Sequence, residues 1–151
     1  MKKNIFYRLF RLGAIPARAL AELEKEEIVV SDEGISGWFK ARNVRGPGKR
    51  YIHKTEGFSG WLAVTKKRLV CFSFWKRQIN ISVDDPRISL LFVDVPDGQT
   101  LSISFESSHF RKGWKGVIEF RFKTEKALQF HSLMRSMGAQ QGTSKDAQHA
   151  S

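Results

Sequence analysis

Apolar and polar residues alternate along much of the chain from residue 28 onward, which is the pattern of antiparallel strands with one face in water. Turn-forming sequences separate the alternating segments, among them residues 84–86, residues 96–98 and the glycine- and proline-rich loop 45–49. Residues 31–34 predict a turn or a bulge. The expected strands are residues 28–30, 35–44, 51–53, 61–65, 68–75, 79–83, 88–95, 101–105 and 117–123. Short strands at this spacing predict a barrel or a sandwich.

An N-terminal extension, residues 1–27, has helical periodicity that breaks between Gly13 and Pro16, where one helix would stop and a second begin. The first helix is basic and amphipathic, and its apolar side includes Phe6, Leu9 and Phe10. Such a helix can lie in a membrane interface, dock on the protein itself or on a neighbouring subunit, or fray in water. Membrane or subunit contact is therefore predicted for Phe6, Leu9 and Phe10.

A third helix is expected after the last strand. Thr124 is a suitable N-cap, Ala127 and Phe130 begin an apolar face, and Gly138 is a natural residue for the position after the helix. Residues 139–151 contain no periodic apolar residue and predict a disordered tail. The expected organisation is thus an extension over 1–27, one β-rich domain over 28–138 and a tail over 139–151.

The predicted hairpin of residues 60–70 reads GWLAVTKKRLV and resembles the run G-x-L-x-(L/V)-T-x-x-R-L-(V/I) of GRAM and bacterial pleckstrin-homology-like (PH-like) domains. Residues 117–123 and 124–130 resemble the last strand and the terminal helix of the same fold, so the similarity covers about residues 27–138. The resemblance implies a partly open seven-stranded β-barrel of two near-orthogonal antiparallel sheets, capped by the C-terminal α-helix. It also implies a module that binds phosphoinositides, phosphopeptides or proteins, or that oligomerises.

Charge narrows the choice of partners. The 151 residues include 26 Lys and Arg against 15 Asp and Glu, a formal net charge of +11 at pH 7, which favours an anionic partner such as nucleic acid or an acidic membrane surface. In a small barrel, the turns that carry many of these cations can lie at one rim, although a solvated surface is the plain alternative. The candidate anion- or headgroup-binding residues are Lys40, Arg42, Arg45, Lys49, Arg50, Lys66, Lys67 and Arg68.

No arrangement of residues indicates catalysis. The four histidines are scattered, and no HExxH, Cys-x-x-Cys, glycine-rich phosphate loop or nucleophile elbow occurs. We therefore expect no enzyme activity, no metal and no cofactor. Cys71, the one cysteine, lies in an apolar run and is expected to be a buried side chain. No segment reaches the roughly 18–20 apolar residues of a transmembrane helix, and Arg8 and Arg11 interrupt a signal-peptide pattern, so we expect a cytoplasmic protein.

Together these features predict a non-enzymatic PH-like module that acts as a membrane-surface or protein-interaction adaptor through a basic rim and the N-terminal helix. Its partner would be an anionic membrane lipid or another protein, and in the first case the protein would be peripheral at the membrane. Two alternatives stay open. A nucleic-acid-binding small β-barrel would use the aromatic residues that interleave with the basic ones. A self-assembling structural oligomer would use the apolar N-terminal helix and exposed edge strands.

Overall fold

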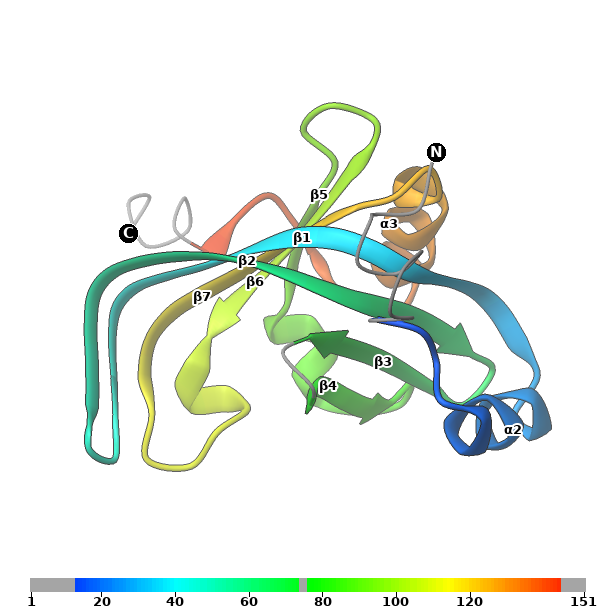
Figure 1. Ribbon diagram of the computed structural model, residues 1–151, viewed down its shortest axis with the longest axis horizontal. Coiled ribbons are helices and arrows are strands. Elements are labelled where there is room, and N and C mark those ends of the chain that lie inside the picture. The colour runs from blue at the N-terminus through cyan, green and yellow to red at the C-terminus, as the bar shows by residue number, and fades with distance from the viewer. Residues whose placement is uncertain (1–12, 74–75, 145–151) are drawn as a thin grey trace. The chain divides into compact units, whose positions relative to one another are not determined.

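The computed structural model describes residues 13–73 and 76–144, and this part of the chain is mainly β-sheet with flanking helices, as the sequence predicts (Figure 1). In chain order the helices and strands are α2 Ala17–Lys25, β1 Ile28–Gly46, β2 Lys49–Thr65, β3 Arg68–Ser73, β4 Lys76–Ser82, β5 Phe92–Asp94, β6 Thr100–Glu106, β7 Lys115–Lys123, α3 Ala127–Ser136 and β8 Gln140–Gln141. Short 3-10 helices precede β5 at Pro86–Leu90 and follow β6 at Ser107–His109.

The strands share one hydrogen-bonded order, β4-β3-β2-β1-β7-β6-β5-β8. The pairs β2–β3, β3–β4, β5–β6 and β6–β7 are antiparallel, whereas β8 runs parallel to β5. The expected seven strands in two sheets are not confirmed, because the described strands form a single order of eight.

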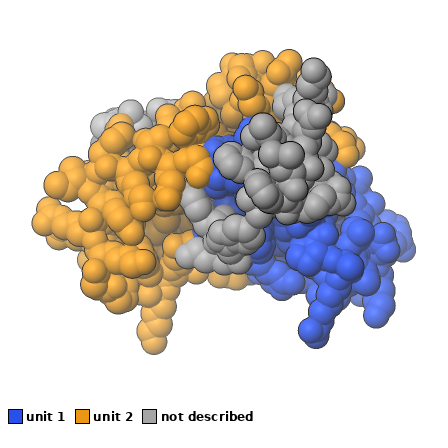
Figure 2. All heavy atoms as spheres, in the orientation of Figure 1, with its two compact units in different colours: residues 1–37, 58–85 blue, residues 38–57, 86–151 orange. Residues whose placement is uncertain are grey.

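The chain divides into two compact units (Figure 2). Unit 1 consists of residues 1–37 and 58–85, and unit 2 consists of residues 38–57 and 86–151. β1 and β2 pass from one unit to the other, so each unit contains part of both strands.

Unit 1 contains the hairpin of β2 and β3 at the predicted position, and its register places Trp61 opposite Phe72 and Val64 opposite Leu69. Thr65 shapes the turn, because its hydroxyl oxygen accepts the backbone N–H groups of Lys67 and Arg68 at 3.1 and 3.0 Å. Helix α2 buries Leu23 in a cluster with Trp61, Ala63 and Val70. One apolar stripe of α2 therefore holds this helix in unit 1.

Unit 2 contains β5, β6 and β7 with the adjoining parts of β1 and β2, and α3 packs against β5 and β6. Strand alternation gives β6 and β7 two different faces. The apolar face contributes paired residues such as Ile103 and Phe120, and the Phe120 ring lies 5.3 Å from that of Phe39 in β1. The opposite face carries Ser104 across from Glu119. This second face is called the polar face below.

Both long strands extend further than the apolar pattern predicts. Residues 54–60 of β2 lack regular alternation, yet the backbone hydrogen bonds of a strand need no apolar side chains. Gly34 has a φ of 63° within β1, where a turn or a bulge is expected, and it does not end the strand. Residues 88–95 are not one strand. They begin inside the 3-10 helix that starts at Pro86, whose ring fixes φ and removes an N–H donor.

The two ends of α3 match the prediction differently. Thr124 lies before the helix, and its hydroxyl oxygen accepts the N–H of Lys126 at 3.1 Å, so it caps the preceding turn and not the helix itself. Gly138 follows the helix with a φ of 115°, the conformation expected of a glycine in that position. Ala127, Phe130 and Met134 are buried, as one apolar face requires.

Residues 139–144 differ from the expectation of a disordered tail. Ala139 is buried, the N–H of Gln140 donates to the carbonyl of Leu91 at 2.8 Å, and the N–H of Ser144 donates to Oγ of Ser104 at 2.8 Å. The open edge of β5 supplies acceptors to a segment that has no apolar periodicity, so the sequence pattern misses it. The remaining predicted tail, 145–151, and the predicted first helix up to residue 12 lie outside the described residues.

Candidate anion-binding site

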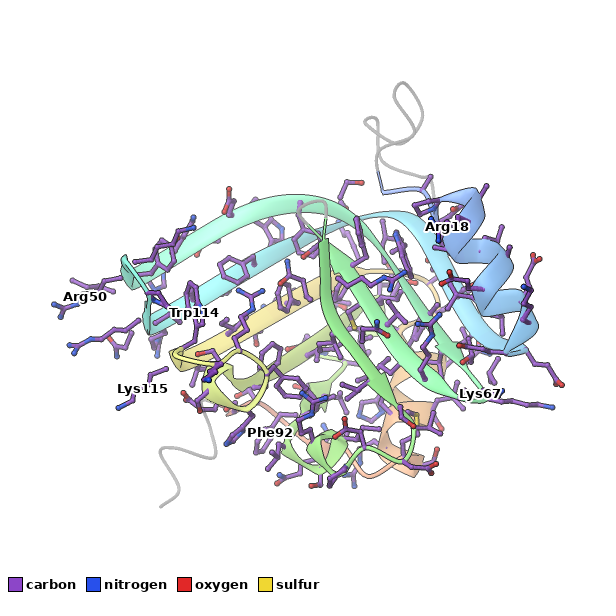
Figure 3. All side chains as sticks on the ribbon, turned by 90° about the horizontal axis from the view of Figure 1, so that it is seen from below. Arg18, Arg50, Lys67, Phe92, Trp114 and Lys115 are labelled. Carbon is purple, nitrogen blue, oxygen red and sulfur yellow. The ribbon has the colours of Figure 1, made fainter. Side chains whose placement is uncertain are left out.

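Two neighbouring loops of unit 2 bring predicted basic residues together with others at one end of the unit. The indole of Trp114, in the loop before β7, lies against the backbone of Gly46, so that a Cβ on Gly46 would overlap the ring. Pro47 lies 3.6 Å from the position a Cβ would take on Gly113. Figure 3 shows Arg50, Trp114 and Lys115 at the same end. We call the exposed cations of these loops and of the strand ends beside them the basic tip: Arg45, Lys49, Arg50, Lys112 and Lys115.

The two segments that carry the basic tip contain no acidic residue, and Glu106, just before the second segment, accepts the backbone N–H of Gly116 at 2.6 Å. Residues 42–53 and 107–118 contain seven Lys and Arg and no Asp or Glu. Arg111 lies 5.7 Å from the centre of the Trp114 ring, and burial lowers the pKa of Arg111 from its usual value. Arg111 and Trp114 therefore support the loop, while the exposed cations of the basic tip face solvent.

The predicted cations of unit 1 have a different environment. Arg68 Nε lies 2.9 Å from Oε2 of Glu26, the residue after α2, and Lys66 forms an ion pair with Glu27. The hydrogen bond and charge of Lys66 lower the pKa of Glu27. Lys67 extends into solvent (Figure 3) and forms no ion pair with a residue that the structure describes. Glu26 and Glu27, which follow α2, thus neutralise two of these three cations. That the three cations bind one ligand together with the unit 2 cations stays a prediction.

A cavity of about 430 Å³ opens on the polar face of unit 2. It collects side chains from four strands that are separated in the sequence. Its charged and hydrogen-bonding residues include Lys40, Arg42, His53, Ser104, Glu119 and Arg121. We call it the polar cavity.

The polar cavity contains more positive than negative charge. Lys40, Arg42 and Arg121 line it with one carboxylate, Glu119, which is a formal excess of two positive charges. Glu119 is already engaged, since one oxygen accepts the Ser102 hydroxyl at 2.9 Å and the other accepts Nε of Arg121 at 2.8 Å. Among the described residues, the side chains of Lys40 and Arg42 form no ion pair.

The backbone at one wall of the polar cavity is unusual. Asn43 in β1 has a φ of 52°, which non-glycine residues adopt infrequently, and Gly116 in β7 has a φ of 104°. A Cβ on Gly116 would overlap the carbonyl oxygen of Asn43. The two strands therefore approach closely beside the cavity, and glycine is the residue that fits there.

Sequence reasoning identified Lys40 and Arg42 but missed the rest of the polar cavity. Glu119 and Arg121 are alternate residues of a strand that the sequence predicts, so their shared face could have been recognised. No sequence signal places them beside Ser104, His53 or Lys40, because strand order decides which strands are neighbours.

The remaining predictions concern reactive groups and membrane contact. No group of histidine, cysteine and acidic residues able to hold a metal ion occurs within 13–73 and 76–144. Cys71 is buried, as expected, and burial raises the pKa of its thiol. In the same ranges, no helix has the length and apolar character needed to cross a membrane. The predicted contact residues Phe6, Leu9 and Phe10 lie outside the described residues.

Comparison with known proteins gives no relative from which a function can be transferred. No protein-family model matches the chain, and no curated protein matches it.

Proposed function

We propose that this protein is a non-enzymatic PH-like module that attaches to an anionic membrane surface through the basic tip. Two features support the PH-like part of the proposal. The strands form two runs of sequential neighbours, β1 to β4 and β5 to β7, which meet through β1 and β7, and α3 follows β7 directly. The hairpin of residues 60–70 carries the GRAM-like run.

The basic tip carries the functional part of the proposal. Its exposed cations lie in and beside two loops that touch through Trp114 and Gly46, so they present their charge together. Each Lys or Arg close to an anionic leaflet contributes about 1 kcal/mol, and the attraction decays over a Debye length of about 8–10 Å. The five cations would therefore contribute about 5 kcal/mol, which suits a reversible and salt-sensitive attachment.

Membrane binding is favoured over nucleic-acid binding by the environment of the aromatic residues. Single-stranded nucleic acid is usually bound by a row of exposed rings on which bases stack. Trp61 is buried in unit 1 and Trp114 is half-buried against Gly46. Trp38, at 57% exposure, is the one aromatic among the largely exposed apolar side chains of the described residues. Charge, and not base stacking, is the property that the basic tip offers.

Vesicle sedimentation at low salt tests the proposal. We expect the protein to sediment with vesicles that contain phosphatidylglycerol and not with vesicles of phosphatidylcholine alone. Lys49→Gln/Arg50→Gln should weaken this binding by about 30-fold, the equivalent of two lost contributions of about 1 kcal/mol. The matched control Arg18→Gln/Lys25→Gln removes the same charge from exposed positions of α2 and should change little.

Three results would contradict parts of the proposal. Equal loss in both double variants would mean that net charge acts without the basic tip. No binding of the wild type to anionic vesicles would eliminate the membrane function, and gel shift and light scattering would then test nucleic acid and self-assembly. If Phe6→Ser/Phe10→Ser binds as the wild type does, the N-terminal segment is not an anchor.

A further inference from the structure

We infer that the polar cavity of unit 2 is a binding site for a phosphomonoester group. This inference goes beyond the proposed function, because the polar cavity and the basic tip consist of different residues. It rests on the hydrogen-bonding state of the lining side chains, on their charge and on the backbone at the cavity wall.

Several side chains that line the polar cavity have hydrogen-bond donors that remain available to a ligand. Lys40 and Arg42 form no ion pair among the described residues, and the contact of Arg121 with Glu119 uses Nε, which leaves its two Nη groups. Ser104 is 1% exposed, and its oxygen accepts the N–H of Ser144, so its hydroxyl hydrogen is available to a ligand. Arginine and lysine form strong charge-assisted hydrogen bonds to phosphate oxygens, and arginine can do so with two parallel bonds.

The one carboxylate that lines the polar cavity already accepts two hydrogen bonds. Glu119, its one carboxylate, receives hydrogen bonds from Ser102 and Arg121 on its two oxygens. A cationic ligand would have to compete with Arg121 for Glu119 and would face the remaining positive charge of Lys40 and Arg42. An anion meets donors without displacing an existing partner, so the site selects negative charge.

The amount of charge favours a phosphomonoester over a carboxylate or a phosphodiester. A phosphomonoester carries about −1.5 to −2 at neutral pH and three acceptor oxygens. The polar cavity has a formal excess of two positive charges, from Lys40, Arg42 and Arg121 against Glu119. Carboxylates and diesters carry a single charge and would leave part of this excess uncompensated. A volume of about 430 Å³ is within the range of small-molecule sites, so the phosphate can carry an organic substituent.

The construction of the cavity wall also indicates a binding function. Asn43 lines the polar cavity in a left-handed conformation, and Gly116 lets the two strands approach closely there. Residues in sparsely populated backbone conformations cluster at binding and catalytic sites. The segment after β8 completes the site, because Thr143 lines it and Ser144 fixes the Ser104 oxygen.

Isothermal titration calorimetry at neutral pH tests this inference with glycerol 3-phosphate and inorganic phosphate as probes and glycerol as the neutral control. We expect saturable heat with both phosphates and none with glycerol. Lys40→Gln/Arg42→Gln should weaken binding at least about tenfold, since it removes two charged donors. Both side chains are at least partly exposed, so the variant should fold, and a thermal melt checks this. Arg18→Gln/Lys25→Gln should bind the phosphates as the wild type does.

Vesicles that contain phosphatidic acid distinguish a lipid-borne phosphomonoester from a soluble one. If Lys40→Gln/Arg42→Gln binds these vesicles more weakly than the control variant, while glycerol 3-phosphate gives no heat, the group comes from a lipid. The inference is overturned if soluble phosphate gives no saturable heat up to about 10 mM and the two variants bind the vesicles equally. It is also overturned if Lys49→Gln/Arg50→Gln abolishes phosphate binding and Lys40→Gln/Arg42→Gln does not, because the phosphate would then bind at the basic tip. The phosphatidylglycerol assay reports on the proposed function separately.

Discussion

The close approach of β1 and β7 beside the polar cavity can be measured by comparing two glycine-to-alanine substitutions. Gly116 and Gly138 have similar positive φ angles, 104° and 115°. Their surroundings differ. A Cβ on Gly116 would overlap the carbonyl oxygen of Asn43, whereas a Cβ on Gly138 would have no heavy atom within 4 Å. Gly138→Ala is therefore a matched control for the backbone cost alone.

The expected free energies of unfolding follow from these two environments. Forcing an alanine into a left-handed conformation costs about 1–2 kcal/mol, and this cost applies to both variants. Overpacking at Gly116 adds about 1–3 kcal/mol, because the obstructing atoms belong to the backbone of β1 and cannot rotate away. We expect Gly116→Ala to lose about 2–5 kcal/mol and Gly138→Ala about 1–2 kcal/mol.

Urea unfolding followed by tryptophan fluorescence gives both values, since the chain contains four tryptophans. The two variants should keep the wild-type dependence on urea and differ in their midpoints. Equal destabilisation by the two substitutions would refute the reasoning, because it would mean that β1 and β7 do not approach closely at Asn43. A folded Gly116→Ala protein should also bind glycerol 3-phosphate more weakly, since Asn43 lines the polar cavity.

Two further predictions concern stability. Glu26→Ala removes the carboxylate that accepts Arg68 Nε at 2.9 Å and the Thr65 hydroxyl at 3.0 Å, so it should cost about 1–3 kcal/mol in urea unfolding, and a double-mutant cycle with Arg68→Ala should show positive coupling. Additive single effects in that cycle would contradict the contact. Hydrogen bonds, first from the Gln99 N–H, lower the pKa of Asp97 from 3.8, so its contribution to stability is present above that pH and is lost as the pH falls. The wild type should therefore be more stable than Asp97→Asn at pH 7, and a difference that does not shrink below about pH 4 would contradict this assignment.

The pattern of apolar residues and the turn-forming residues were sufficient to predict much of the fold. The hairpin of β2 and β3 was predictable because a short apolar run lies on each side of Thr65 and the two lysines that follow it. Helices α2 and α3 were predictable from their apolar stripes, and Gly138 from the backbone conformation that ends a helix. The continuous β2 and the added β8 were not predictable, because backbone pairing with a neighbouring strand forms them and their side chains show no apolar period.

For the candidate sites too, some features follow from the sequence and others only from the tertiary structure. The sequence by itself determined that the protein is basic, that Lys40, Arg42 and the 45–50 loop concentrate positive charge, and that the strands have a wet face. Charge and local periodicity are properties of neighbouring residues, so they can be read from the chain. Only the tertiary structure decided that the carboxylates just after α2 pair with Lys66 and Arg68, and that β7 brings Arg121 to the cavity lined by Lys40 and Arg42. These contacts depend on which strands and helices become neighbours, and that choice is made by packing over the whole domain.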